Sequence, residues 1–376
     1  MDPNTYSLYF HFPFCQKKCP YCHFYVIPPK DLHKKILLEA LSEEWKLHLP
    51  KFQSKRLVSI YFGGGTPSLF PEGIETVLNW ILKSPITLDP NVEITVEANP
   101  EFLDKEKFLS LKKAGVNRVS LGAQSFHEKD LQMLQRDHSP LEIEKAFSTL
   151  LTTGFSNISL DLMYDIPGQT RSSFQTSLQR CLMLPFTHLS LYNLTIEPHT
   201  SFYKKKVALE KKRPSSKQSL HMLEDAIHFL QEKGFTRYEI SAFCKDGLIS
   251  KHNMGYWLGR DFIGLGPSSS SFWKGERSKN QSSLLRYHQN LKQKKDFLEE
   301  KEKLPFLSLQ KELFCLQLRL IKGALKSCFE KLLEEKSFLL KIKELKEQGL
   351  VQETTTHIAL SKKGLLFHDF VASELI

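Results

Sequence analysis

The sequence predicts an α/β protein whose residues 1–240 form a partial (β/α)6 barrel, followed by a smaller C-terminal domain of helical, winged-helix-like type. Strand-like and helix-like segments alternate through residues 1–240, which favours a parallel sheet with right-handed crossovers. The six predicted units are two short of a closed eight-unit barrel. Residues 304–376 instead predict helices followed by a short pair of strands.

The predicted strands are short runs rich in β-branched, leucine or aromatic residues. They span residues 8–12, 57–62, 92–96, 118–121, 158–163 and 188–194. Apolar residues that recur every three or four positions predict helices at 32–47, 72–82, 105–114, 143–151, 173–184 and 220–233. Ligands of such a fold gather at the carboxyl ends of the strands, so the residues that follow each strand are candidates for function.

The remaining segments are more polar. A basic, serine- and proline-containing stretch at 204–218 is expected to be a surface excursion, and the charged stretch at 279–303 a connecting helix or linker. Beyond it, helices at 310–321 and 337–348 precede strands at 349–351 and 356–361 and a last helix. Winged-helix modules often bind DNA but also pack against enzyme cores, and we expect the packing role here.

The amino-acid composition limits the kinds of protein that this chain can be. With 376 residues, 41% hydrophobic and 25% charged, the chain resembles an ordinary soluble globular protein. The formal charge of +10 would suit nucleic acid or an acidic surface, but it lies largely in lysine runs that solvated faces explain, so nucleic-acid binding is not expected. Four of the seven cysteines are scattered, which argues against a disulfide framework. With no signal segment and no membrane span in the sequence, we expect a reduced, cytoplasmic protein.

Three cysteines lie directly after the first predicted strand. Cys15, Cys19 and Cys22 have C-x3-C-x2-C spacing, and no fourth cysteine is nearby. Three thiolates can hold a [4Fe–4S] cluster and leave one iron open for another ligand. The alternatives are a zinc loop completed by His23 or by a distant ligand, and a chance grouping.

The residues around the cysteines carry a family resemblance. The stretches YFHFPFC, ending at Cys15, and CPYC, ending at Cys22, resemble the cluster loop of the radical S-adenosylmethionine (radical SAM) enzymes. Within this superfamily, the two stretches are similar to the branch that contains oxygen-independent coproporphyrinogen III oxidase and the HemW-type heme chaperones. The resemblance implies a partial radical SAM barrel in which the open iron binds S-adenosylmethionine.

The same resemblance implies a set of cofactor contacts at the strand ends. The GGGTP segment matches a family segment that contacts the methionine amino group, and an acid at the third strand end suits a ribose diol. On residues alone, the glycines equally suit a tight turn, and the charged residues suit surface or buried structural roles. The expected cofactor-binding residues are Tyr9, Tyr21, Gly64, Gly65, Thr66, Glu97, Gln124, Arg136 and Asp161.

A second motif lies at KHNMGYW. His252, Tyr256 and Trp257 place a metal-binding nitrogen near two aromatic rings, which suits a porphyrin but equally a packed core. H-N-x-x-Y-W resembles the motif of the heme chaperone branch, so residues 241–303 are expected to hold the heme motif and a linker. Three departures count. Four serines, 268–271, stand where the family is expected to have a turn with a histidine. Phe24 stands where coproporphyrinogen oxidases usually have a cysteine, and His23 stands where the chaperones are expected to have an acid.

Two main functions remain open at this stage. The first is a heme chaperone that carries a [4Fe–4S] cluster, S-adenosylmethionine and heme, and transfers heme to an acceptor protein. The second is an enzyme, oxygen-independent coproporphyrinogen III dehydrogenase, whose catalytic residues the sequence does not identify. A flavodoxin-type or ferredoxin-type electron donor suits either function, and a nucleic-acid-binding protein is the weaker third alternative.

Overall fold

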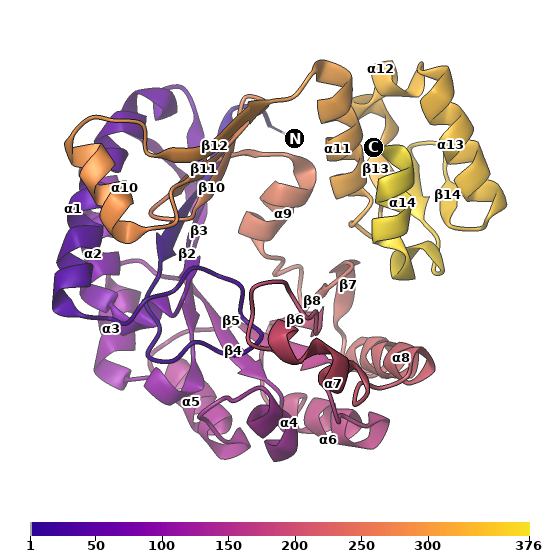
Figure 1. Ribbon diagram of the computed structural model, residues 1–376, viewed down its shortest axis with the longest axis horizontal. Coiled ribbons are helices and arrows are strands. Elements are labelled where there is room, and N and C mark those ends of the chain that lie inside the picture. The colour runs from indigo at the N-terminus through magenta and orange to yellow at the C-terminus, as the bar shows by residue number, and fades with distance from the viewer. Residues whose placement is uncertain (1) are drawn as a thin grey trace.

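The computed structural model describes residues 2–376, which form an open twelve-stranded sheet covered by helices and a small three-stranded sheet near the C-terminus (Figure 1). Six central strands run parallel in chain order and confirm the six predicted strands. They are β1 (Thr5–Phe12), β2 (Arg56–Gly64), β3 (Thr87–Ala98), β4 (Arg118–Gln124), β5 (Asn157–Tyr164) and β6 (His188–Asn193). The sheet does not close on itself, so the barrel is partial.

Helices follow these strands in the chain, and the longer ones cover the outer face of the sheet (Figure 1). They are α1 (Asp31–His48), α2 (Pro71–Lys83), α3 (Lys105–Lys113), α4 (Glu128–Met133), α5 (Pro140–Thr152), α6 (Arg171–Cys181), α7 (Lys206–Glu210) and α8 (Ser216–Glu232). Short 3-10 helices lie at Leu49–Phe52, Pro67–Leu69, Pro100–Phe102, Tyr203–Lys205, Lys326–Cys328 and Gly364–Leu366. None of the helices within residues 2–376 has the length and apolarity that crossing a bilayer requires.

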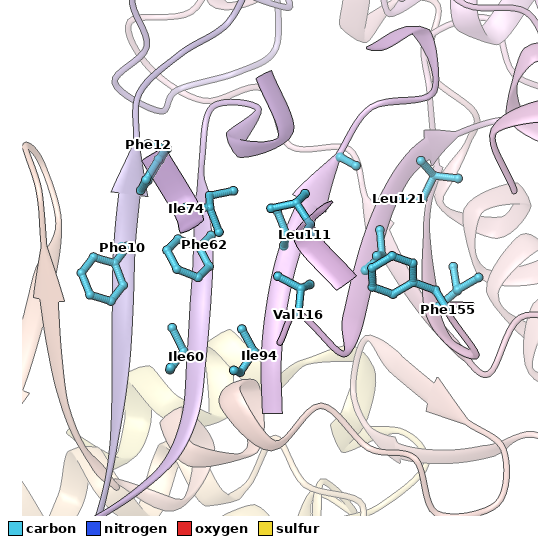
Figure 2. Close-up of a cluster of buried hydrophobic side chains, with 14 of the residues drawn as sticks. Phe10, Phe12, Ile60, Phe62, Ile74, Ile94, Leu111, Val116, Leu121 and Phe155 are labelled. Atoms are coloured by element: carbon cyan, nitrogen blue, oxygen red, sulfur yellow. The ribbon is translucent and has the colours of Figure 1, made fainter. Parts of the chain in front are cut away.

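Alternation along the strands decides which side chains enter the barrel. Phe10, Phe62 and Leu121 point toward the helices and belong to one buried apolar cluster, as Figure 2 shows. Their neighbours, such as Tyr61 and Ser120, face the opposite side, because successive side chains of a strand alternate. The barrel interior is therefore polar, and its groups need partners within the protein.

The sheet continues beyond the six predicted strands at both edges. At one edge lie β8 (Ala242–Cys244) and β7 (Thr236–Glu239); at the other lie β9 (Asp261–Leu265), β10 (Ser270–Trp273), β11 (Glu276–Asn280) and β12 (Leu298–Lys303). Only β9 is parallel to its barrel neighbour, β1. Residues 279–303 are thus not the expected connecting helix or linker, because they contain β12, part of β11 and α10 (Leu284–Lys292). Charged residues suit β12, since it is an exposed edge strand.

The C-terminal domain has an apolar core of its own. It contains α11 (Phe306–Gln317), α12 (Glu330–Leu333), α13 (Lys336–Glu347), α14 (His368–Leu375), β13 (Ala324–Leu325), β14 (Val351–Glu353) and β15 (His357–Leu360). Helices with a small antiparallel sheet agree with the winged-helix-like prediction. Helix α9 (Lys251–Leu258) lies between the barrel and this domain and contacts α11 (Figure 1).

One buried carboxylate connects α1 to the sheet extension. Glu44 is fully buried, and it accepts hydrogen bonds from the Gly266 backbone N–H (2.8 Å), the Asn280 amide (2.7 Å) and the Tyr287 hydroxyl. These three donors belong to the turn after β9, to β11 and to α10. A buried charge is tolerated only when it has such partners, so Glu44 fixes the position of the extension against the barrel.

Replacing Glu44 tests this connection. Glu44→Ala should lower the free energy of unfolding by about 3 kcal/mol, because it leaves buried donors without an acceptor. The adjacent Glu43→Ala is the matched control, since Glu43 is exposed and forms a surface ion pair with Lys46, and it should change stability by less than about 0.5 kcal/mol. Denaturant unfolding followed by circular dichroism measures both, and equal effects would contradict the assignment.

Candidate functional site

The cysteine loop lies at the carboxyl end of β1. The backbone N–H of Cys15 donates to Ile27 O (3.0 Å) and that of Ile27 donates to Pro13 O (2.6 Å), so the loop returns to its own beginning. Cys15, Cys19 and Cys22 carry free thiols that line one cavity of about 460 Å³. We call it the strand-end cavity, because most of its other walls are the ends of β2 to β6.

Three free thiols on one loop match the ligand number of a [4Fe–4S] cluster with one open iron. Within residues 2–376, no three His, Cys, Asp or Glu side chains converge as one metal ion requires. A polynuclear cluster needs no such convergence, since each thiolate binds a different iron. Burial raises the pKa of the Cys15 thiol to about 11, and a metal that binds it must displace this proton.

The glycine segment brings its backbone against the cysteine loop. Gly65 N–H donates to Phe12 O (2.9 Å) and Thr66 N–H to Phe14 O (2.7 Å). A Cβ on Gly65 would lie 2.5 Å from Phe14 O, so this approach requires glycine. The Thr66 hydroxyl lies 3.6 Å from the Cys15 sulfur. The segment therefore joins the cluster loop to the cavity wall.

Glu97 ends β3 inside the strand-end cavity. Its carboxylate accepts hydrogen bonds from the Tyr61 hydroxyl (2.8 Å) and from the Gly64 backbone N–H (3.2 Å). Burial raises the pKa of Glu97 to about 7, although both hydrogen bonds oppose the shift. The carboxylate has fewer partners than a buried charge needs, so it can accept further hydrogen bonds from a ligand with hydroxyl groups.

Asp161 and Gln124 lie on the neighbouring strands. Asp161 accepts from the Ser120 hydroxyl at 3.2 and 3.3 Å, and burial raises its pKa to about 6. Gln124 has a φ of 65°, an uncommon conformation for a residue other than glycine. Both residues line the strand-end cavity, together with Glu97.

Arg136 bridges the cysteine loop and the strand ends. It donates to Asn99 Oδ1 (2.8 Å), to Gly122 O (3.0 Å) and to the Cys19 sulfur (3.5 Å). Its Nε is buried and has no hydrogen-bond partner among the described residues. The sequence alone would have placed this arginine on the surface, whereas the structure puts it in the cavity wall.

The two tyrosines of the cysteine stretch lie apart. Tyr21 lines the strand-end cavity and packs against Phe202, with the ring centroids 6.2 Å apart. Tyr9 lies behind the wall, where its hydroxyl is 3.1 Å from His11 Nδ1. The other expected cluster and cofactor residues of the barrel thus line the strand-end cavity, whereas Tyr9 does not.

The second motif lies at the opposite end of the barrel. His252 is 1% exposed; its Nδ1 is 3.0 Å from the Ser59 hydroxyl and its Nε2 is 2.8 Å from the Tyr256 hydroxyl. Burial lowers the pKa of His252 to about 3, so the imidazole is neutral. Trp257 packs under Arg319, whose guanidinium carbon lies 4.3 Å from the ring centroid. Both motif residues are thus engaged within the protein in this conformation.

Sequence analysis missed part of the strand-end cavity. Tyr192 and Asn193, at the end of β6, line it, as does Glu197 farther along the chain. The rule that found Glu97 passed over the β6 residues, because they lie inside the predicted strand 188–194 and not after it. Glu197 has no comparable signal in the sequence.

Comparisons with known proteins agree with this geometry. A model of the radical SAM superfamily matches residues 9–181. The chain is 33% identical over 373 residues to the heme chaperone HemW of Lactococcus lactis, covering 96% of this chain and 94% of that protein. It is 34% identical over 373 residues to the heme chaperone HemW of Bacillus subtilis, covering 96% of each.

A solved structure shares the fold. Coproporphyrinogen III oxidase (HemN) from Escherichia coli, a radical SAM enzyme, matches with a TM-score of 0.86 at 23% identity, over 99% of this chain and 90% of that chain. The match covers the barrel, the sheet extension and the C-terminal domain together. At this identity it shows the architecture only.

The raised pKa of Glu97 predicts a pH-dependent stability. An acid whose pKa rises on folding stabilises the fold at low pH, and this contribution is lost as the pH increases from about 4.5 to about 7. Glu97→Gln removes the titration but keeps an acceptor for Tyr61. In the cofactor-free protein, its stability relative to wild type should increase from pH 5 to pH 8, by up to about 3 kcal/mol. Thermal unfolding across this range measures the change, and exposed Glu106→Gln is the control that should show none.

Proposed function

The chain belongs to the radical SAM superfamily and, within it, to the family of HemW heme chaperones, and from this premise we propose that it binds heme and transfers it to an acceptor protein. The observation that carries the proposal is the identity of about one third with heme chaperones over nearly the whole chain, including the C-terminal domain. A [4Fe–4S] cluster and S-adenosylmethionine are the cofactors of this function.

The strand-end cavity fits both cofactors. Cys15, Cys19 and Cys22 would hold three irons of the cluster, and the remaining iron would bind S-adenosylmethionine. The cluster supplies an electron that the sulfonium of the cofactor can accept. Glu97 offers an acceptor for the ribose diol, and the unpartnered Nε of Arg136 is a donor for the carboxylate.

One position favours the chaperone over the oxidase. Phe24, where the oxidases usually carry a cysteine, is 53% exposed beside the cluster loop and cannot act as a thiol. The oxidase remains the alternative because HemN shares the architecture. For an oxidase, the strand-end cavity would have to admit a porphyrinogen next to S-adenosylmethionine.

Partners and location follow from the same proposal. The acceptor of heme is a protein, and cluster reduction calls for a flavodoxin-type or ferredoxin-type donor. A low-potential cluster survives in a reducing compartment, so the proposal includes the cytoplasm. The C-terminal domain packs on α9 through Trp257 and Arg319, which supports a structural role rather than nucleic-acid binding.

His252 is our candidate for a heme-iron ligand. A neutral imidazole can bind the iron, but Nε2 is hydrogen-bonded to Tyr256, so this role requires the tyrosine hydroxyl to move away. Trp257 would need to leave Arg319 to stack on a porphyrin. A different ligand would leave His252 as a structural residue of α9.

The cluster can be tested by reconstitution. Anaerobic reconstitution should give about four iron per chain with iron–sulfur absorption in the visible range. Alanine at Cys15, Cys19 or Cys22 should abolish both, because each thiolate binds one iron. Cys328→Ala, which removes an exposed cysteine outside the loop, should retain them. Bound zinc without iron–sulfur absorption in the intact protein would contradict the assignment.

Heme uptake and oxidation of coproporphyrinogen can be compared on one reconstituted sample. The chaperone should bind hemin with a Soret shift, pass it to an apo-hemoprotein and release no decarboxylated porphyrinogen. Decarboxylation with S-adenosylmethionine consumption would replace the chaperone with the oxidase.

The ligand role of His252 is tested in the same titration. His252→Ala should change the Soret band of the bound hemin if the imidazole binds iron, and Tyr256→Phe, which frees Nε2, should retain ligation. Identical spectra for wild type and His252→Ala would assign the ligand elsewhere.

A further inference from the structure

A second cavity lies between α9, the sheet extension and the C-terminal domain. We call it the α9 cavity; it has a volume of about 520 Å³ and is lined by residues of α9, β9 to β12 and α11. Since β1 and β9 run parallel and Tyr6 pairs with Asp261, the start of β9 lies at the amino end of the barrel. The α9 cavity and the strand-end cavity share no lining residue.

One part of the α9 cavity is aromatic and aliphatic. Tyr256 and Phe262 meet edge to face with ring centroids 4.6 Å apart, and Phe272 lies beside Phe262 at 6.5 Å. Leu313 and Leu316 of α11 add aliphatic surface from the C-terminal domain. A volume of this size falls in the range of roughly 300 to 1,000 Å³ that is usual for pockets of medium-sized organic ligands.

The charged residues of the cavity are paired, with one exception. Arg277 forms ion pairs with Glu302 and Glu312, Lys279 pairs with Glu299 and Glu300, and Lys301 pairs with Glu276. The distance is 2.6 Å between Arg277 and Glu302 and 3.2 Å between Lys301 and Glu276. These cations are therefore largely neutralised by carboxylates of the protein.

Arg260 is the exception. Its Nη1 donates to neutral acceptors, Lys251 O at 2.9 Å and the Ser7 hydroxyl at 3.4 Å. Its Nε is buried, and within residues 2–376 it has no hydrogen-bond partner. No carboxylate lies within ion-pair distance of Arg260 among the described residues. Arg260 is half-buried at the cavity wall, and a guanidinium that has no carboxylate partner beside an apolar surface favours a ligand that carries a carboxylate on a flat apolar body.

We propose that the α9 cavity is the heme-binding site, with the porphyrin against Phe262, Phe272 and Leu316 and one propionate on Arg260. This inference rests on the proposed function, which supplies the cargo, and adds the place where the cargo binds. Tyr256 belongs both to this cavity and to the hydrogen bond with His252, so the motif helix forms one wall of the site. Heme and S-adenosylmethionine then occupy opposite ends of the barrel.

Hemin titration of the full-length, cluster-reconstituted protein tests this site. Arg260→Gln removes the free cation, and Ser278→Trp fills the cavity from β11 without deleting a charged group. Each should weaken one-to-one hemin binding by roughly tenfold or more, while iron content and S-adenosylmethionine binding stay at the wild-type level. Arg286→Gln, which removes an exposed arginine of α10, is the matched control for loss of one positive charge and should bind hemin normally.

The outcomes separate this inference from the proposed function. If wild type binds hemin and both cavity variants bind it with the same affinity, the site lies elsewhere and the chaperone proposal stands. An equal loss in Arg286→Gln would assign the effect to overall charge and overturn the site. If wild type takes up no hemin at all, the proposed function falls and the site falls with it.

Discussion

The structure depends on how the polar interior of the open barrel is satisfied. Strand alternation sends apolar residues to the helices and polar residues inward, where Glu97, Tyr61 and His252 lie in contact. Tyr61 donates to Glu97, its ring lies 4.9 Å from that of His252, and His252 is hydrogen-bonded to Tyr256. Each polar group finds a partner in the next, as polar groups in a protein interior require.

Helix α9 completes this interior from the amino end of the barrel. The Glu93 carboxylate on β3 accepts from the backbone N–H groups of Lys251 (2.9 Å) and His252 (3.0 Å), the first residues of the helix. A carboxylate at a helix N-terminus satisfies free N–H groups and is favoured by the helix dipole. The C-terminal domain covers the other side of α9 through Arg319 and Trp257. The helix is thus held by charge on one side and by packing on the other.

The sequence was sufficient for the barrel and for most of the strand-end cavity, since both follow from local patterns. Glu97 could be identified because strand ends of this fold meet at one edge, and Asp161 because an acid within an apolar strand resembles a family position near the cofactor. The sheet extension could not, because the pairing of β9 with β1 joins residues far apart in the chain and the charged sequence of β12 resembles a linker. The hydrogen bonds of His252 could not be predicted either, since its partner Ser59 lies 193 residues away in the sequence.

The polar interior also connects the two ends of the barrel electrostatically. Burial raises the pKa of Tyr256, and the negative charge of Glu97 adds to this shift, although the two residues line different cavities. The charge of Glu97 acts on Tyr256 across the interior, because charges in a poorly hydrated interior are weakly screened. His252 lies between them and is neutral, with its ring against Tyr61 and its Nε2 hydrogen-bonded to Tyr256. Helix α9, which Glu93 and Arg319 hold in place, keeps Tyr256 in hydrogen-bond contact with His252 at the amino end of this interior.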